Sequence, residues 1–160
     1  MPEVRRRGDA LRNRLQQARF ESPAQETVLN LLVASSHVRE LIEQACAPLG
    51  LSPGQYNVLR ILRGAEPGGY PRCEIARRML ERAPDLTRMI DRLSERGLVE
   101  RGRSSEDRRH SVTRITRRGL ELLDEARPAI EALHRTVTAR LTKRECEQLS
   151  ELLERLYGEE

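Results

Sequence analysis

The sequence predicts a mainly α-helical protein with one small β-hairpin. Apolar residues recur at helical spacing through most of the chain, and capping residues, prolines and glycines mark where these runs begin and end. Within residues 72–118 the pattern reads as helix, tight turn, helix and then a short polar hairpin that is rich in arginine. This order is typical of a winged helix-turn-helix. We expect further helices to flank it at both ends of the chain.

The second helix of this unit is predicted at residues 84–96. Pro84 suits the first turn because it has no amide proton to leave unpaired, and Gly97 suits the position just past the end. Four apolar residues at the spacing i, i+3, i+4 and i+7 build one stripe: Leu86, Met89, Ile90 and Leu93. The polar residues away from this stripe are Asp85, Thr87, Arg88 and Arg92. One face of the helix should therefore pack inward and leave the other free to bind.

Positive charge is concentrated in the same segment. The whole chain has a formal net charge of +4, whereas residues 72–118 hold 14 arginines against 8 acidic residues. Fixed cations favour duplex DNA as a partner because they release counterions from its phosphates. A charge run is more often a solvated surface, so the helix and hairpin pattern decides in favour of DNA. Lys143 is the only lysine; arginine suits phosphate and guanine, but a compositional bias of the genome would give the same preference.

Helix starts are marked by three capping boxes, in which an N-cap hydroxyl is followed three residues later by Gln or Glu. The boxes are Ser22 with Gln25, Ser52 with Gln55, and Thr142 with Glu145. Pro48 and Gly50 should end the long helix that the first box begins. We therefore expect a long helix near the N-terminus, a shorter one after it and a final helix at the C-terminus.

The remaining elements lie around the turn. The helix before it is predicted at residues 72–81, and it should bury Ile75, Ala76, Met79 and Leu80. The hairpin is predicted at residues 98–103 and 111–115, mainly from its position between two well-marked helices, because strand alternation is weak. Thr116 can cap the next helix, in which we expect Pro128 to cause a bend.

Apolar stripes on the end helices predict a homodimer. A DNA-binding unit of this size cannot cover both, and the economical solution is that they pack on the same helices of a second chain. The predicted organisation is a basic N-terminal segment at 1–21, a dimerisation helix at 22–50, a DNA-binding region at 51–118 and C-terminal dimerisation helices at 119–160. Two recognition helices would then lie about 34 Å apart and read an inverted repeat. A monomeric bundle is the alternative, and the mass in solution separates the two.

Cysteine usage and the absence of long apolar runs predict a cytoplasmic protein. Cys46, Cys73 and Cys146 are odd in number and widely separated, which fits a reducing compartment. We expect the first two of these thiols to be buried in packing and the third to lie at the surface or an interface. No secretory segment opens the chain, and no run is long enough to cross a bilayer, so we expect no membrane partner.

The sequence predicts neither a metal site nor a cofactor nor an enzyme. The histidines His37, His110 and His134 are scattered, without the spacing of metal ligands. No phosphate-binding glycine loop, nucleophile elbow or zinc-protease motif is present. The alternative to a DNA-binding regulator is a winged helix that binds an acidic protein without sequence-specific DNA binding. Salt-dependent binding to an inverted repeat would separate these interpretations.

The order of elements and several motifs resemble the MarR family of bacterial transcriptional regulators. The resemblance covers roughly residues 22–157, and its most specific stretches are Leu-Thr-Arg-Met-Ile-Asp-Arg-Leu at 86–93, Gly-Leu-Val-Glu-Arg at 97–101, Glu-Asp-Arg-Arg at 106–109 and Ile-Thr-Arg-Arg-Gly at 115–119. It implies an obligate homodimer that represses nearby genes until a small molecule or oxidant releases it. By position, the reactive cysteine of hydroperoxide-sensing members corresponds to Leu29 here, which disfavours that mechanism.

The resemblance also implies roles for residues of the wing and the recognition helix. Arg109 is the candidate for entry into the minor groove, where narrow A·T-rich tracts favour arginine, and Asp107 would orient the wing. Arg88 is the candidate for a base edge, Thr87 for a base or phosphate, and Arg92 for a phosphate. The full set of predicted DNA-binding residues is Asp85, Thr87, Arg88, Arg92, Ser105, Asp107, Arg108, Arg109 and His110.

Members that bind phenols or aromatic acids imply an effector pocket. It would lie between the dimer helices and the DNA-binding unit and would take a small aromatic or acidic molecule. By position, His37, Tyr56 and Arg60 could line it. From the residues alone, Tyr56 could equally be part of the core and Arg60 a surface cation.

Overall fold

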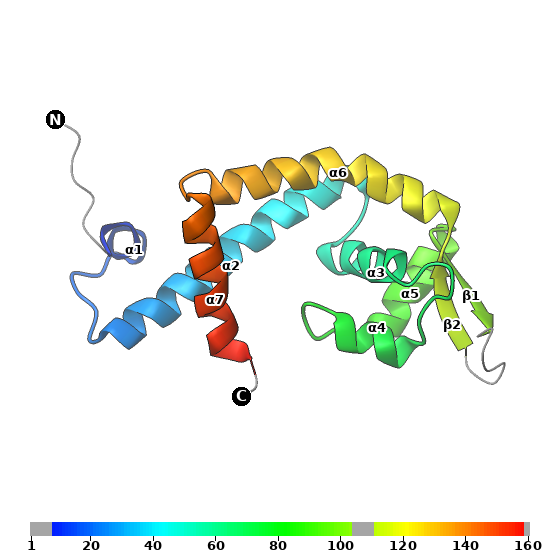
Figure 1. The fold of residues 1–160 in the computed structure, drawn as a ribbon, viewed down its shortest axis with the longest axis horizontal. Helices are drawn as coiled ribbons and strands as arrows, with labels where there is room; N and C mark the ends of the chain where they lie inside the picture. The colour runs from blue at the N-terminus through cyan, green and yellow to red at the C-terminus, as the bar shows by residue number, and fades with distance from the viewer. Residues whose placement is uncertain (1–7, 104–110, 159–160) are drawn as a thin grey trace. The chain divides into compact units, whose positions relative to one another are not determined.

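The computed structural model describes residues 8–103 and 111–158 of the chain. In chain order its elements are α1 (Asp9–Leu15), α2 (Pro23–Cys46), the 3-10 helix η1 (Ala47–Leu49), α3 (Pro53–Arg63), α4 (Arg72–Arg78), α5 (Leu86–Glu95), β1 (Val99–Arg103), β2 (Ser111–Ile115), α6 (Arg117–Thr138) and α7 (Lys143–Tyr157) (Figure 1). The chain forms two units, Met1–Leu41 and Ile42–Glu160. The mainly α-helical fold class with one small hairpin is confirmed.

The first unit contains α1 and most of α2. The helix α1 was not predicted, because residues 1–21 were interpreted only as a basic segment; its Leu11 is 3% exposed. The start of α2 agrees in part with the predicted capping box. The Gln25 N–H donates to Ser22 Oγ at 3.1 Å, but Gln25 Oε1 accepts from the N–H of Glu21 at 2.7 Å instead of from Ser22.

The second unit begins with the last turn of α2. Gly50 has φ 62°, a left-handed conformation that ends the helical path after η1. The capping boxes of Ser52 and Thr142 are both complete and begin α3 and α7. Thr116 caps α6 by accepting a hydrogen bond from the Gly119 N–H. These four boundaries confirm the predictions made from local sequence.

The first helix of the helix-turn-helix is shorter than predicted. Helix α4 ends at Arg78, because Met79 is extended (ψ 137°) and the N–H of Leu80 donates to Asn57 Oδ1 of α3 at 2.9 Å. Leu80 therefore lies outside the helix and is 83% exposed, and Ala76 lies on an exposed side of α4, so the prediction that these two residues are buried was wrong. Helix α5 begins two residues later than predicted, with Asp85 at its N-cap.

The wing is an antiparallel pair whose register runs from Val99 opposite Ile115 to Arg103 opposite Ser111. Tyr70 extends this sheet by one residue: its N–H donates to the Thr113 carbonyl at 3.0 Å and its carbonyl accepts from the Thr113 N–H at 2.8 Å. The loop before α4 is thereby attached to the second strand of the wing.

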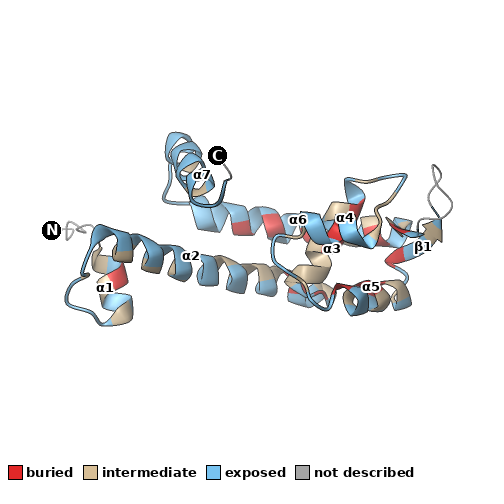
Figure 2. Ribbon diagram, turned by 90° about the horizontal axis from the view of Figure 1, so that it is seen from below, coloured by how far each residue is buried: buried red, intermediate tan, exposed pale blue. Residues whose placement is uncertain are grey.

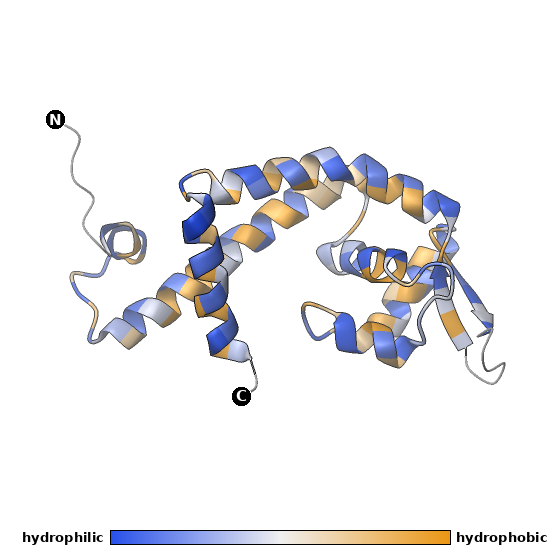
Figure 3. Cartoon of the chain, viewed as in Figure 1, coloured by the Kyte–Doolittle hydropathy of each residue, from blue (hydrophilic) through white to orange (hydrophobic). Residues whose placement is uncertain are grey.

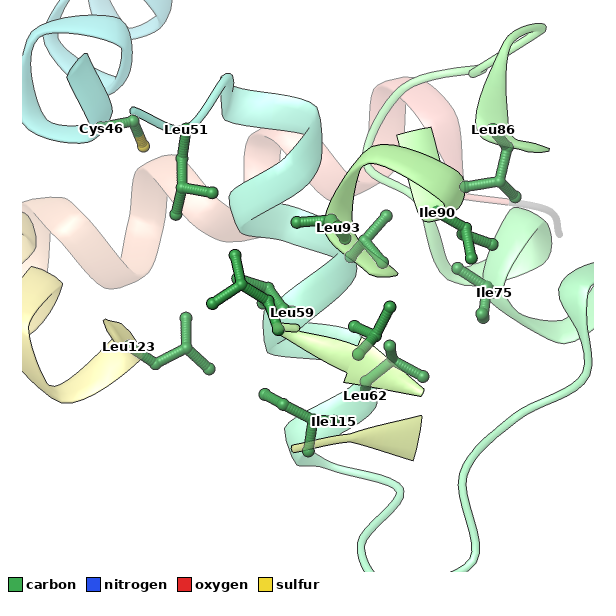
Figure 4. Packing of buried hydrophobic residues seen from close by; sticks show 13 residues of the cluster. Cys46, Leu51, Leu59, Leu62, Ile75, Leu86, Ile90, Leu93, Ile115 and Leu123 are labelled. Carbon is green, nitrogen blue, oxygen red and sulfur yellow. The ribbon is translucent and has the colours of Figure 1, made fainter. Parts of the chain in front are cut away.

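The core of the second unit gathers leucines and isoleucines from α3, α4, α5, the hairpin and α6 (Figure 4). Buried residues concentrate around α3 to α6, whereas α7 is largely exposed (Figure 2). Helices α2 and α7 each carry apolar residues in a mixed pattern with polar ones (Figure 3). Their large exposed apolar residues are Val28, Leu31 and Leu32 on α2 and Leu149, Leu152, Leu156 and Tyr157 on α7. Within its own unit, each of these helices therefore carries exposed apolar side chains.

Candidate nucleic-acid interface

Helix α5 has one face in the core and one face in solvent. Leu86, Ile90 and Leu93 are at most 4% exposed, and they pack among the core residues. Thr87, Arg88 and Arg92 occupy exposed positions between them. Because the apolar stripe sets the rotation of the helix about its own axis, the three polar side chains lie on its solvent side.

The side chains of the two arginines on this face have no acidic partner among the described residues. Neither the Arg88 nor the Arg92 side chain forms an ion pair or a hydrogen bond with the described part of the chain. By contrast, Arg101 of β1 pairs with Asp91 of α5 and joins the wing to the recognition helix. The guanidinium groups of Arg88 and Arg92 thus retain their donors for an external anion.

The first turns of α4 and α5 meet through their side chains. Arg72 Nη1 donates to Thr87 Oγ1 at 3.1 Å, and both residues are exposed. Asp85 makes no side-chain capping hydrogen bond at the start of α5. The N–H of Leu86 donates to the Ala83 carbonyl at 3.2 Å, and the Asp85 carboxylate is exposed beside it, so the group at this place that is suited to a phosphate is the Arg72 guanidinium.

Other arginines of the basic segment have roles inside the fold. Arg78 pairs with Glu74 at 2.8 Å and lies 4.6 Å from the centre of the Tyr70 ring, a cation–π contact. Arg114 Nη2 donates to the carbonyl of Arg103 at 2.8 Å across the hairpin. The high arginine content of residues 72–118 is therefore divided between structural contacts and free cations.

The tip of the wing was predicted to contribute Ser105, Asp107, Arg108, Arg109 and His110. These residues lie outside the described part of the chain. The structure places the two strands that lead to them.

A cleft of about 600 Å³ lies between α3 and α6 in the second unit. It includes Tyr56 and Arg60, two of the three residues predicted for an effector pocket, and Arg60 Nη1 donates to the Tyr56 hydroxyl at 3.4 Å. His37 lies at an exposed position of α2 in the first unit, and the cleft is formed entirely by residues of the second. The structure therefore brings two of the three together.

The cleft contains further polar residues that were not predicted from the sequence. Arg63 of α3 and Arg127 and His134 of α6 line it, above the apolar side chains of Leu123 and Ile130. Asp124 accepts hydrogen bonds from Arg127 and from Arg63, the latter at 3.3 Å, and these arginines lower its pKa below the ordinary value, Arg127 contributing most. The spacing of Tyr56, Arg60 and Arg63 at i, i+4 and i+7 was the signal that could have found this face.

The cysteines occupy three different environments. Cys46 is fully buried, as predicted, and burial raises the pKa of its thiol. Cys73 is exposed on α4, so the prediction that it is buried was wrong; it lies on the solvent side of a short helix whose only buried residue is Ile75. Cys146 is half-buried on α7. Within residues 8–103 and 111–158, no helix is long and apolar enough to cross a membrane.

A two-stranded wing, an α4–α5 helix-turn-helix and a recognition helix with free arginines define a winged-helix DNA-binding protein. Comparison with known proteins supports the same class. The model of the MarR family matches residues 51–111. The homoprotocatechuate degradative operon repressor of Escherichia coli is 30% identical over 121 residues, which are 76% of this chain and 78% of that protein.

Solved structures agree in fold and sequence. The MarR transcription factor of Planctomyces limnophilus superposes with a TM-score of 0.65 at 38% identity and covers 85% of this chain and 98% of its own. A mutant of Escherichia coli MarR in complex with operator DNA gives a TM-score of 0.71 at 26% identity, with 79% and 90% of the two chains covered. The chain belongs to the MarR family of transcriptional regulators. Its relatives are regulators rather than enzymes, as the sequence predicted.

Proposed function

We propose that the protein is a homodimeric repressor that binds an inverted-repeat operator. The observation that carries the proposal is the exposed face of α5, where Arg88 and Arg92 have no acidic partner among residues 8–103 and 111–158, while the opposite face is held in the core. Arg88 is proposed to contact a base edge and Arg92 a phosphate, with Thr87 and Arg72 beside them. The wing, with Arg109 at its tip, would enter the adjacent minor groove.

Dimerisation is supported by the uncovered apolar residues of α2 and α7. Side chains such as Leu32, 62% exposed, and Leu156, 60% exposed, would remain in water in a monomer. Burying these side chains against a second copy would stabilise the dimer by about 25 cal/mol for each Å² of apolar surface removed from water. A two-fold pair would present two copies of α5 to successive turns of one face of the duplex.

The experiment that tests this function is selection of bound duplexes from a random library, followed by footprinting on genomic DNA. The proposal expects an inverted repeat whose two half-sites are both protected. Enrichment of any duplex in proportion to its length, with no shared sequence, would show a general polyanion binder instead. That outcome would favour the protein-interaction alternative for the basic face.

The α3–α6 cleft is proposed as the site of a small aromatic or acidic effector. Arg60 offers donors to a carboxylate, and Arg63 and Arg127, which also pair with Asp124, add positive charge beside it. Leu123 and Ile130 offer an apolar surface to a ring, and Glu131 is the acidic residue of the lining. Salicylate and benzoate are suitable probes, with benzyl alcohol as the uncharged control. The acids should raise the melting temperature and release the selected duplex, and Arg60→Gln should reduce both effects. Equal effects of the acids and the alcohol would argue against an anion site.

A further inference from the structure

Arg96, the residue that ends α5, connects the recognition helix to a distant part of the chain. Its Nη1 donates to the carbonyl of Gly50 at 2.7 Å and its Nη2 donates to the carbonyl of Leu49 at 3.0 Å. Both acceptors belong to the connection between α2 and α3. The guanidinium is half-buried, and within the described residues it pairs with no carboxylate.

The two carbonyls need such a donor because they lie at the C-terminal end of a short 3-10 helix, at its last residue and its C-cap. The last carbonyls of a helix have no partner within it. Gly50 turns the chain with φ 62°, and a Cβ built on it would lie 3.7 Å from Arg96 Nη2, so the guanidinium lies directly against this turn. A planar guanidinium can serve two acceptors in a fixed geometry, which a lysine ammonium cannot reproduce.

This pair of hydrogen bonds adds direction to a helix that is otherwise held by apolar packing. The burial of Ile90 and Leu93 in the core opposes their exposure to water, but its free energy depends little on the direction in which the side chains meet their neighbours. Hydrogen bonds depend strongly on distance and angle. The contact of Arg96 therefore restrains the tilt of α5 at its C-terminal end.

We propose that Arg96 is a positioning residue for operator recognition that does not touch DNA. By joining the end of α5 to the α2–α3 connection, it sets where Arg88 and Arg92 meet the groove. The inference rests on the proposal that α5 reads the operator. A displacement of the α2–α3 connection would also be transmitted to α5 through these two hydrogen bonds.

The salt dependence of binding separates this role from a phosphate contact. A cation that neutralises a phosphate contributes about one unit to the slope of log K against log salt concentration, and a cation bound to main-chain carbonyls contributes nothing. The measurements are the affinities of Arg96→Gln and Arg96→Lys for the selected duplex and for a scrambled duplex at several KCl concentrations. Arg135→Gln, which removes one exposed charge from α6, is the matched control.

Arg96→Gln should weaken binding to the selected duplex about tenfold, the loss expected for charge-assisted hydrogen bonds. Its affinity for the scrambled duplex and its salt slope should equal those of the unmodified protein. Arg96→Lys should lose selectivity in the same direction, and because it keeps the charge it provides the test if Arg96→Gln does not fold. The control should bind both duplexes normally.

Two results would overturn the inference. Equal losses on both duplexes, with the slope reduced by about one, would show that Arg96 binds a phosphate. Unchanged selectivity in both Arg96 variants would show that its contacts are dispensable. Arg88→Ala, measured in parallel, separates failure of this inference from failure of the proposed function. If α5 does not read the operator, Arg88→Ala will keep its full selectivity; if only the inference about Arg96 fails, Arg88→Ala will still lose selectivity.

Discussion

Arg72 in the first turn of α4 and Thr87 in the first turn of α5 share a hydrogen bond of 3.1 Å between Nη1 and Oγ1. The bond joins the two helices of the helix-turn-helix on their exposed side, close to the start of α5. It orients the guanidinium, which keeps its other donors for a phosphate. We therefore expect the two residues to act together in the proposed binding of DNA.

Thr87→Val keeps the shape of the side chain and removes its hydroxyl. Operator binding should weaken by about 1 kcal/mol, the usual net value of one such hydrogen bond. Because the hydroxyl acts through Arg72, the losses of Thr87→Val and Arg72→Ala should be less than additive in the double variant. Fluorescence anisotropy with the selected duplex measures all three. Strictly additive losses would mean that the two residues contact DNA independently.

Arg88→Ala and Arg92→Ala should weaken binding in different ways. Loss of a base contact at Arg88 should cost about 1–3 kcal/mol on the operator and relax discrimination at one base pair. Loss of a phosphate contact at Arg92 should weaken every duplex alike and lower the salt slope by about one. Competition binding against duplexes with single base changes gives both quantities. An Arg88→Ala variant with unaltered base preference would exclude its proposed role.

The start of α7 should respond to acid through Glu145. Its carboxylate accepts from the Thr142 N–H at 2.8 Å and from the Thr142 hydroxyl, and these hydrogen bonds lower its pKa, the backbone bond most. A carboxyl with a lower pKa in the folded state stabilises it above the unfolded pKa, about 4.3, and loses this contribution as pH falls through the lower folded value.

Glu145→Gln removes this titrating carboxyl group, so the melting temperature of the variant should be lower than that of the unmodified protein at neutral pH. The difference should shrink as pH falls through the acid range. Calorimetry at a series of pH values measures it, with the exposed Glu151→Gln on the same helix as control. Parallel curves at all pH values would show that Glu145 adds nothing to the acid response.

Leu152→Glu should prevent dimerisation. Leu152 is 50% exposed on α7, among the uncovered apolar residues of that helix, and a carboxylate there would be buried without a partner in a dimer. Light scattering after size exclusion should give twice the 18.4 kDa of one chain for the unmodified protein and 18.4 kDa for the variant. Glu151→Gln should remain dimeric. A dimeric Leu152→Glu would place the interface elsewhere.

Local signals predicted the starts of α3, α6 and α7, and the end of α4 was missed because it depends on a long-range contact. Ser52 and Thr142 need only a neighbour three residues away, so their capping boxes are visible in the sequence. The end of α4 depends on Asn57, which lies 23 residues before Leu80 and takes its N–H. Helix α1 was missed because it is a single short segment of 7 residues with one buried side chain, Leu11.

The same distinction between local and long-range signals applies to the candidate site. The exposed face of α5 could be derived from one helical period, because Leu86, Ile90 and Leu93 define the buried side. The residues that line the α3–α6 cleft could not be derived in this way, because Arg127 and His134 reach it from a helix more than 60 residues further along the chain. Nor did composition show which of the many arginines serve the fold, as Arg96 does through Leu49 and Gly50.

The most direct test of the account is the dependence of binding on the spacing between half-sites. Two copies of α5 in one rigid dimer require half-site centres about one helical turn apart. Inserting about 5 base pairs, half a turn, at the centre of the selected duplex should reduce its affinity to that of a single half-site. Affinity that is indifferent to the insertion would contradict paired recognition by a dimer.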